Sequence, residues 1–338
     1  PIPDGVPLEE ASFVTLGAIA MQGVRLAELQ IGEQVVVYGL GLVGMVTAQL
    51  CAASGCRVIG VDLDPEKVNK AKGFGIDALL VGADTESLVL QMTGGYGADK
   101  VLMCAATKSN APIEAVPGLT RQKGMLVVVG DVTMDVPRRA YYDKEIDIRI
   151  SRSYGPGRYD PSYENGGIDY PFAYVRWTQN RNMSSFLELV SRRRMDVGSL
   201  ITHRFGIDEA HGAYRIIEGS VREPHLGIVI RYAEDAAPPV LPSRLVPRAP
   251  VTRPAAGEVA IGMIGAGNFA KAFLLPAFCD QPNVTLKAVC TASGVSAAAV
   301  AKKYGNARAT NDAESVLSDP SINLVVIATR HDSHADYV

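Results

Sequence analysis

The sequence predicts an α/β protein with two doubly wound parallel sheets joined by a Pro- and Ala-rich linker. Three observations predict it. Short β-branched apolar runs alternate with amphipathic helical stretches along most of the 338 residues. A glycine-rich turn follows such a run twice, at residues 39–44 and 265–270. Residues 233–257 are rich in proline and alanine and hold few apolar side chains, which is typical of an extended linker. The alternative for that segment is a loop packed on one domain. The predicted domains are therefore 1–232 and 258–338.

The first glycine turn lies between a predicted strand and a predicted helix. Residues 35–38 are too few for a helix and rich in β-branched side chains, which favours a buried parallel strand. Gly39 permits a tight turn, Gly41 lets the backbone approach a pyrophosphate, and Gly44 lets helix and strand pack closely. Residues 45–53 then repeat apolar side chains at helical spacing. This order of elements predicts a Rossmann-type dinucleotide site.

An acidic side chain ends the second predicted strand of this unit. Asp62 is placed to accept hydrogen bonds from both hydroxyls of an adenine ribose. With Asp64 it repels a 2′-phosphate, so NAD is favoured over NADP in the first domain. The helix N-terminus offers free N–H groups to the phosphates. The alternative is a βαβ unit that holds no ligand. The residues expected to contact the cofactor here are Gly39, Gly41, Leu42, Val43, Gly44, Asp62, Cys104 and Ala105.

The other elements of the first domain follow in the order that a parallel sheet requires. Residues 8–29 are amphipathic and helical, and Asp64 caps a helix whose first position is Pro65. Right-handed crossovers would place the helices on both faces of one sheet. Strands are predicted at 57–61, 78–81, 98–105, 124–130, 200–205 and 226–231, and helices at 66–72, 86–93, 113–119 and 207–218.

Composition limits the class of protein. The length suggests roughly two domains, and 47% hydrophobic residues with a formal charge of -3 are ordinary for a globular chain. No basic excess points to nucleic acid, and no apolar run approaches the roughly 20 residues of a membrane span. The five cysteines show no metal-ligand spacing, so we expect no metal site within the chain and a reducing, cytoplasmic location.

The second glycine turn repeats the pattern with alanine in its third position. Residues 259–264 are a predicted strand, residues 271–278 a helix, and the next strand, 284–290, ends without a carboxylate. NAD and NADP are therefore equally compatible with this domain. Further helices are predicted at 297–304 and 312–317, and a strand at 323–328. The residues expected to contact the cofactor are Gly265, Gly267, Asn268, Phe269, Thr291, Ser293, Ala328, Thr329 and His331.

Three segments carry a family resemblance. They read EEASFVTLGAIAMQG, GEQVVVYGLGLVG and VIGVDLDPEKVNKAKGFGID. Residues 1–232 thereby resemble the cofactor domain of the zinc-type medium-chain alcohol dehydrogenases. The resemblance implies a catalytic zinc held mostly by a domain that would precede Pro1. Because the chain begins with Pro and ends inside a continuing pattern, we expect a fragment of a longer protein whose zinc ligands lie outside it.

The strand, turn and helix after residue 258 resemble the N-terminal half of the Gfo/Idh/MocA oxidoreductases over about 80 residues. Arg330 stands at a position where that family usually has proline. The family's catalytic lysine would follow Val338, so the catalytic residues of this chain are unknown. The combination resembles the bi-domain oxidoreductases of polysaccharide and cell-surface glycan biosynthesis.

Residues 152–182 form a Gly- and Pro-punctuated segment rich in tyrosine and arginine, with the single Trp177. Aromatic faces, hydroxyls and guanidinium forks suit a sugar or a phosphate. Fastening of the loop to its domain or to a partner subunit is an equal alternative.

Two functions remain. The first is an NAD(P)-dependent oxidoreductase that acts on a CH–OH group, with a sugar-like small molecule as substrate, no nucleic acid or membrane span, and a homo-oligomeric state. The second is a catalytically silent dinucleotide-binding or assembly module. For residues 1–338 alone we expect NADH binding without turnover.

Overall fold

The computed structural model describes residues 1–232, 257–292, 294–305, 307–329 and 333–338. The predicted linker, apart from residue 257, lies outside the described residues. Contacts between Cα atoms divide the chain into two units. The first holds residues 1–207 and 219–231, and the second holds residues 208–218 and 232–338.

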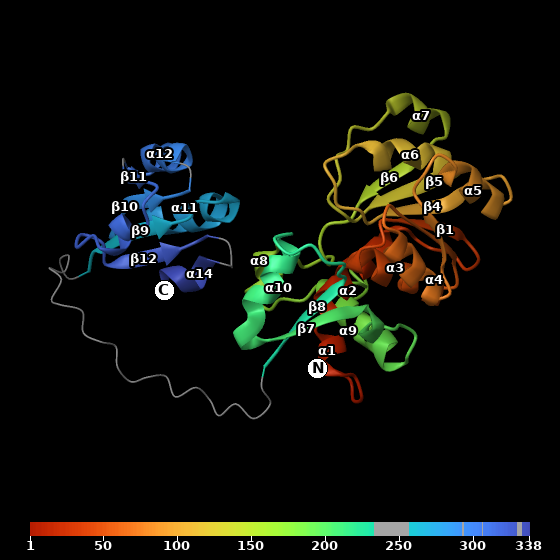
Figure 1. Ribbon diagram of the computed structural model, residues 1–338, viewed down its shortest axis with the longest axis horizontal. Coiled ribbons are helices and arrows are strands. Elements are labelled where there is room, and N and C mark those ends of the chain that lie inside the picture. Colours follow the sequence, from red (N-terminus) through yellow and green to blue (C-terminus); the bar gives the residue numbers. More distant parts are fainter. Residues whose placement is uncertain (233–256, 293, 306, 330–332) are drawn as a thin grey trace. The chain divides into compact units, whose positions relative to one another are not determined.

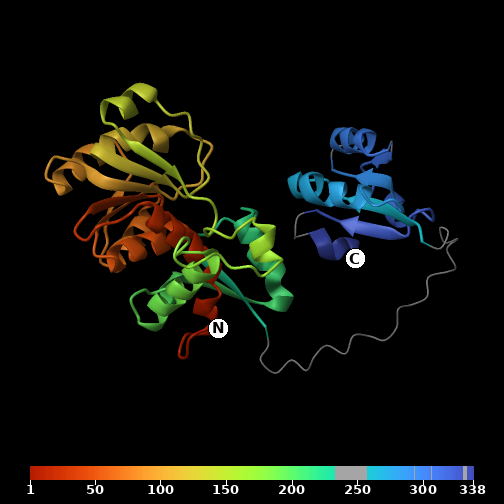
Figure 2. The same ribbon diagram turned by 180° about the vertical axis from the view of Figure 1, so that it is seen from behind.

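The first unit contains a six-stranded parallel sheet in the order β3-β2-β1-β4-β5-β6. This order, with helices on both sides (Figure 1 and Figure 2), confirms the predicted α/β fold class. The strands are β1 (Gln34–Tyr38), β2 (Arg57–Asp62), β3 (Asp77–Leu80), β4 (Ala98–Met103), β5 (Thr120–Val128) and β6 (Asp147–Ile150). The helices are α1 (Leu8–Ala11), α2 (Val14–Leu26), α3 (Leu42–Ala53), α4 (Pro65–Gly73), α5 (Thr85–Met92), α6 (Ala111–Leu119), α7 (Arg138–Asp143), α8 (Pro161–Glu164) and α9 (Gln179–Ser191).

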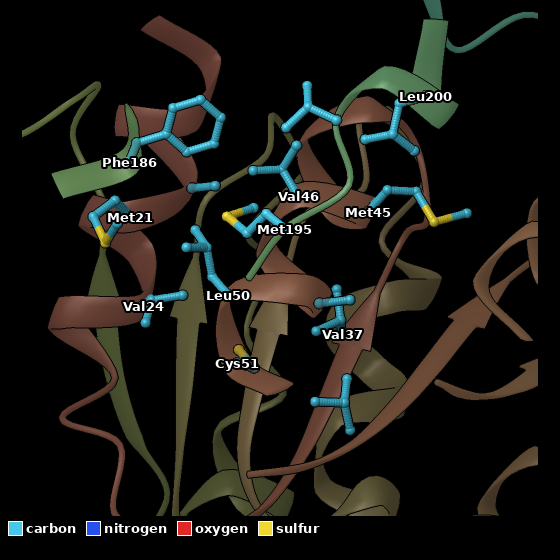
Figure 3. Close-up of a cluster of buried hydrophobic side chains, with 14 of the residues drawn as sticks. Met21, Val24, Val37, Met45, Val46, Leu50, Cys51, Phe186, Met195 and Leu200 are labelled. Carbon is cyan, nitrogen blue, oxygen red and sulfur yellow. The ribbon is translucent and has the colours of Figure 1, made fainter. Parts of the chain in front are cut away.

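The central strand is buried on both faces. Val35, Val36 and Val37 are all fully buried. Val35 and Val37 pack into a core that includes side chains of α2, α3 and α9, whereas Val36 packs into a second core with side chains of α5 and α6. Figure 3 shows part of the first core, from Met21 to Leu200. Burial on both faces explains why β1 reads as a continuous apolar run.

A parallel pair, β7 (Ile201–Gly206) and β8 (Gly227–Arg231), follows the first sheet. The predicted helix 207–218 is a 3₁₀ turn, Ile207–Glu209, followed by α10 (Ala210–Ile217). A 3₁₀ turn also precedes β7, at Gly198–Leu200. In the described part of the chain, no helix is both long and apolar enough to cross a bilayer.

The second unit contains a four-stranded parallel sheet in the order β11-β10-β9-β12. The helix after its glycine turn is wider than predicted, because residues 270–274 are π-helical. Pro276 has no N–H to donate to the preceding turn, which accounts for a break in the regular ladder there. The elements are β9 (Val259–Ile264), η3 (Ala270–Leu274), α11 (Leu275–Cys279), β10 (Val284–Cys290), α12 (Gly294–Lys303), β11 (Arg308–Thr310), α13 (Glu314–Leu317), β12 (Leu324–Ile327) and α14 (His334–Tyr337).

Candidate functional site: two glycine turns

The first glycine turn joins the carboxyl end of β1 to the start of α3. Gly39 has a φ of 94°, and a Cβ atom there would lie 2.6 Å from the backbone nitrogen of Ala105. Its N–H donates to the carbonyl oxygen of Val61 at 2.7 Å. The turn is therefore held between the ends of β2 and β4, and only glycine fits its backbone.

The other two glycines of this turn differ in their surroundings. A Cβ on Gly44 would lie 1.8 Å from the carbonyl oxygen of Gly39, so α3 starts directly against the turn. Gly41 precedes the helix with an ordinary φ of -65°, and a Cβ there would meet nothing within 4 Å. The space beside Gly41 is thus open, next to the first turn of α3 formed by Leu42 and Val43. Free N–H groups at such a helix end attract phosphate.

Asp62 stands at the carboxyl end of β2, at the same edge of the sheet. One carboxylate oxygen accepts from the N–H of Leu40 at 2.5 Å, and the other accepts from the N–H of Asp64 at 2.9 Å. The half-buried carboxylate is thereby fixed beside the glycine turn. Each oxygen keeps a lone pair for a further donor, such as a ribose hydroxyl.

Cys104 and Ala105 follow β4 and close the other side of the turn. The Cys104 thiol lies 3.6 Å from the Thr47 hydroxyl, and its N–H donates to the carbonyl oxygen of Tyr38. Burial raises the pKa of the Cys104 thiol to about 12, partly offset by the Thr47 hydrogen bond. A thiol that stays protonated is a packing group and a poor nucleophile.

Because of the raised pKa of the Cys104 thiol, we expect the folded protein to lose stability at alkaline pH. The unfolded thiol releases its proton near pH 9 and the folded thiol near pH 12. The contribution of the protonated Cys104 thiol to the free energy of unfolding is complete below pH 9. It is lost as the pH rises toward 12, by at most about 1.4 kcal/mol per pH unit. Urea unfolding at pH 8 and pH 10.5 should show a smaller loss for Cys104→Ser than for the wild type. An equal loss of stability in the two proteins would contradict a Cys104 thiol that stays protonated in the folded state.

The second glycine turn repeats the geometry of the first. Gly265 has a φ of 89°, and a Cβ atom there would lie 2.5 Å from the carbonyl carbon of Ala328. A Cβ on Gly267 would meet nothing within 4 Å. Ala270, in the third position, is buried at 1% exposure, so a methyl group fits where the first turn requires glycine.

A cavity of about 1280 Å³ opens over this turn. Seven of the nine residues predicted for the second domain line it: Gly265, Gly267, Asn268, Phe269, Thr291, Ala328 and Thr329. The other two, Ser293 and His331, lie outside the described residues. His334, for which the sequence favoured a loop or cofactor-adjacent role over metal binding, also lines the cavity. So do four polar residues that the sequence did not single out: Ser296, Asn311, Asp312 and Glu314. Asn311 and Asp312 follow β11 at the carboxyl end of a parallel strand, a position that indicates a ligand-lining role only once β11 itself is known.

The segment rich in tyrosine and arginine largely pairs with itself. The rings of Tyr163 and Tyr170 stack with centroids 5.5 Å apart, and the Tyr170 hydroxyl donates to Asp160. Arg158 donates to Glu164 at 2.7 Å. These contacts fasten the segment as a fold element, one of the two alternatives that its composition left open.

The side chains of the described residues do not form a zinc site. No group of three or more His, Cys, Asp or Glu side chains among them is arranged to hold a metal ion. A catalytic zinc requires three protein ligands and an open position.

Two family models match the chain in separate segments. Residues 43–165 match the family described as zinc-binding dehydrogenase, and residues 259–338 match the oxidoreductase family with an NAD-binding Rossmann fold, Gfo/Idh/MocA. Both segments include residues of a glycine turn.

Curated and solved relatives match about two thirds of the chain. Sorbitol dehydrogenase from Halalkalibacterium halodurans is 29% identical over 226 residues, which cover 64% of this chain and 58% of that protein. Sorbitol dehydrogenase from Homo sapiens is 26% identical, covering 63% of this chain and 54% of that protein. The structure of galactitol-1-phosphate dehydrogenase from Escherichia coli is similar with a TM-score of 0.54 and 19% identity, covering 66% of this chain and 61% of that one. This chain thus spans less than two thirds of the length of each. The chain therefore carries matches to two oxidoreductase families in separate segments of its sequence.

Proposed function

We propose that this chain forms the dinucleotide-binding part of an NAD(P)-dependent oxidoreductase that acts on a CH–OH group. The observation that carries the proposal is the repeated turn. A glycine of positive φ follows β1 and another follows β9, and each is followed two residues later by a glycine with open space beside it. This geometry admits a pyrophosphate against backbone N–H groups. We assign NAD to the first turn, on account of Asp62, and NAD or NADP to the second.

The residues around each turn would bind and orient the cofactor. At the first turn, the start of α3 receives the diphosphate and Asp62 accepts from the ribose hydroxyls, while Cys104 and Ala105 close the side nearest β4. At the second turn, Asn268 and Phe269 border the diphosphate, and Ala328 and Thr329 take the place of Cys104 and Ala105. A bound nicotinamide supplies the hydride acceptor or donor.

The substrate class is part of the same proposal. The curated relatives are named as sorbitol dehydrogenases, which favours a polyol or sugar. The pairing of two oxidoreductase families supports a sugar or sugar nucleotide of polysaccharide or cell-surface glycan biosynthesis. Five free cysteines support a reducing, cytoplasmic location. We further propose that residues 1–232 and 258–338 form separate domains. We also propose that the protein is a homo-oligomer.

Replacing Asp62 by asparagine tests the assignment of NAD to the first turn. The change keeps the size of the side chain and removes the charge that strengthens its hydrogen bonds to ribose, so NADH should bind about 10–100-fold more weakly. NADPH should be affected less, because the repulsion of its 2′-phosphate also disappears. Calorimetric titration in a Gly267→Val background, which fills the space beside the second turn, isolates the first site.

Asp64→Asn is the matched control for Asp62→Asn. Asp64 caps α4 by accepting from the N–H of Glu66 and lies 3.5 Å from Lys67. Its replacement removes part of the repulsion of a 2′-phosphate but no contact with the ribose, so the ratio of NADH to NADPH affinity should fall less than in Asp62→Asn. If Asp62→Asn lowers that ratio no more than Asp64→Asn does, Asp62 does not contact the ribose. If the parent binds neither dinucleotide, the proposed function itself is wrong.

A further inference from the structure

The single tryptophan of the chain is stacked between two arginines. The guanidinium carbon of Arg25, on α2, lies 3.2 Å from the centroid of the Trp177 ring, and that of Arg176 lies 3.8 Å from it. Two guanidinium groups at these distances would overlap on one face, so each covers its own face of the ring. Arg25 lies far away in the sequence, and the stack therefore joins α2 to the segment between β6 and α9.

Neither arginine of this stack has a carboxylate partner among the described residues. The Nε atom of Arg25 donates to the Asn182 side chain at 2.7 Å, and an Nη atom donates to Ser185 at 3.3 Å, both neutral groups. The three acids between β6 and α9 are engaged elsewhere: Asp160 with Tyr170, Glu164 with Arg158, and Asp169 with Arg181. Two positive charges thus flank one ring without compensation.

The surroundings of Arg25 destabilise its positive charge. Arg25 is partly buried, and burial together with the nearby charge of Arg176 lowers the pKa of its guanidinium to about 10. Arg176 is exposed, and it also lies over the ring of Phe172 at 4.5 Å. A stack that served only to hold the segment on α2 would need Arg25 alone. The second, exposed guanidinium adds repulsion, which a bound anion would relieve.

We propose that Arg25, Trp177 and Arg176 form a binding site for a phosphate group. All three side chains carry hydrogen-bond donors and no acceptor, and the Trp177 indole N–H makes no hydrogen bond to another described residue. Guanidinium groups bind phosphate oxygens in a two-pronged geometry at about 2.7–2.9 Å. A phosphate group beside the ring would therefore be attracted by both guanidinium groups.

This site is separate from the two glycine turns in its residues and its chemistry. The glycine turns offer backbone N–H groups, whereas this site offers two guanidinium groups and an indole. The phosphate can belong to a phosphate monoester, such as a sugar phosphate, or to a nucleoside diphosphate. The shared element is the phosphate group, and binding to it does not depend on the proposed oxidoreductase activity.

The fluorescence of Trp177 tests the proposal directly, because no other tryptophan contributes to the signal. The full chain is titrated with sodium phosphate and, in parallel, with sodium chloride at equal ionic strength. We expect a saturable change in emission with phosphate and none with chloride. Pyrophosphate and uridine diphosphate serve as two further probes. Tighter binding of uridine diphosphate than of pyrophosphate assigns a nucleotide, and equal binding assigns the phosphate group alone.

Two matched variants separate binding from folding. Arg176→Gln removes the exposed guanidinium and should weaken phosphate binding at least tenfold. Arg152→Gln removes another exposed arginine, which stacks on Tyr159 at 4.4 Å, and should leave binding unchanged. Circular dichroism melting of both variants checks that the fold is retained. A linear response to phosphate, a response equal to that with chloride, or unchanged binding in a folded Arg176→Gln variant would overturn the proposal.

Discussion

Replacing Gly44 by alanine is expected to destabilise the first unit by about 3 kcal/mol. The added methyl group would lie 1.8 Å from the carbonyl oxygen of Gly39, closer than any real contact. The helix cannot give way freely, since Met45 and Val46, which follow, are fully buried in the core. The start of α3 must therefore move away from β1, and packing between helix and strand is lost.

Gly41→Ala is the control for Gly44→Ala, three residues away in the same turn. Its backbone is in an ordinary conformation and its surroundings are open, so the change should cost at most about 1 kcal/mol through a poorer helix cap. Urea unfolding followed by the fluorescence of Trp177 reports on the first unit, which contains that residue. Equal midpoints for the two variants would show that α3 does not start against the turn as described.

The glycine turns were predictable because their constraints are local. A strand too short to be a helix, a glycine that must take positive φ and a helix that starts at once leave few alternatives over ten residues. The same holds for α4, whose cap at Asp64 and first residue Pro65 are observed as predicted. The predicted strands at residues 57–61 and 78–81 correspond to β2 and β3, within one residue at each end.

Elements without such signals were missed. Neither β6, four residues of alternating charge and isoleucine at the sheet edge, nor β11, only three residues long, has an apolar run. Both are recognisable only from the neighbouring strand they pair with. Asn311 and Asp312 in the lining of the second cavity were missed for the same reason, since both follow the unpredicted β11.

The stack around Trp177 shows a different limit of sequence reading. The composition of residues 152–182 indicated aromatic and guanidinium chemistry, but the second arginine comes from α2, far earlier in the chain. Whether an arginine meets a carboxylate depends on contacts across such distances. The sequence therefore left binding and fastening as equal alternatives. The structure shows paired groups around Tyr163, and at Trp177 two arginines without a carboxylate partner among the described residues.

The largest effect on binding is expected from valine at the open glycine of each turn. Both Gly41 and Gly267 have space for a side chain, so Gly41→Val and Gly267→Val should fold. That space is where a diphosphate would meet the helix N-terminus, so a branched side chain should weaken dinucleotide binding at that turn at least 100-fold. The two variants thereby separate two sites that bind related ligands.

Calorimetric titration with NADH, and with NADPH where the second turn prefers it, counts the sites. We expect two sites per chain in the wild type, one in each single variant and none in the double variant. Loss of binding in a single variant that is matched by a lower melting temperature would reflect unfolding, so melting is measured on the same samples. If the folded double variant still binds a dinucleotide at full stoichiometry, the cofactor does not lie against these turns, and the assignment of both sites falls. If only Gly41→Val changes the titration, the second turn is a structural copy of the first that holds no cofactor.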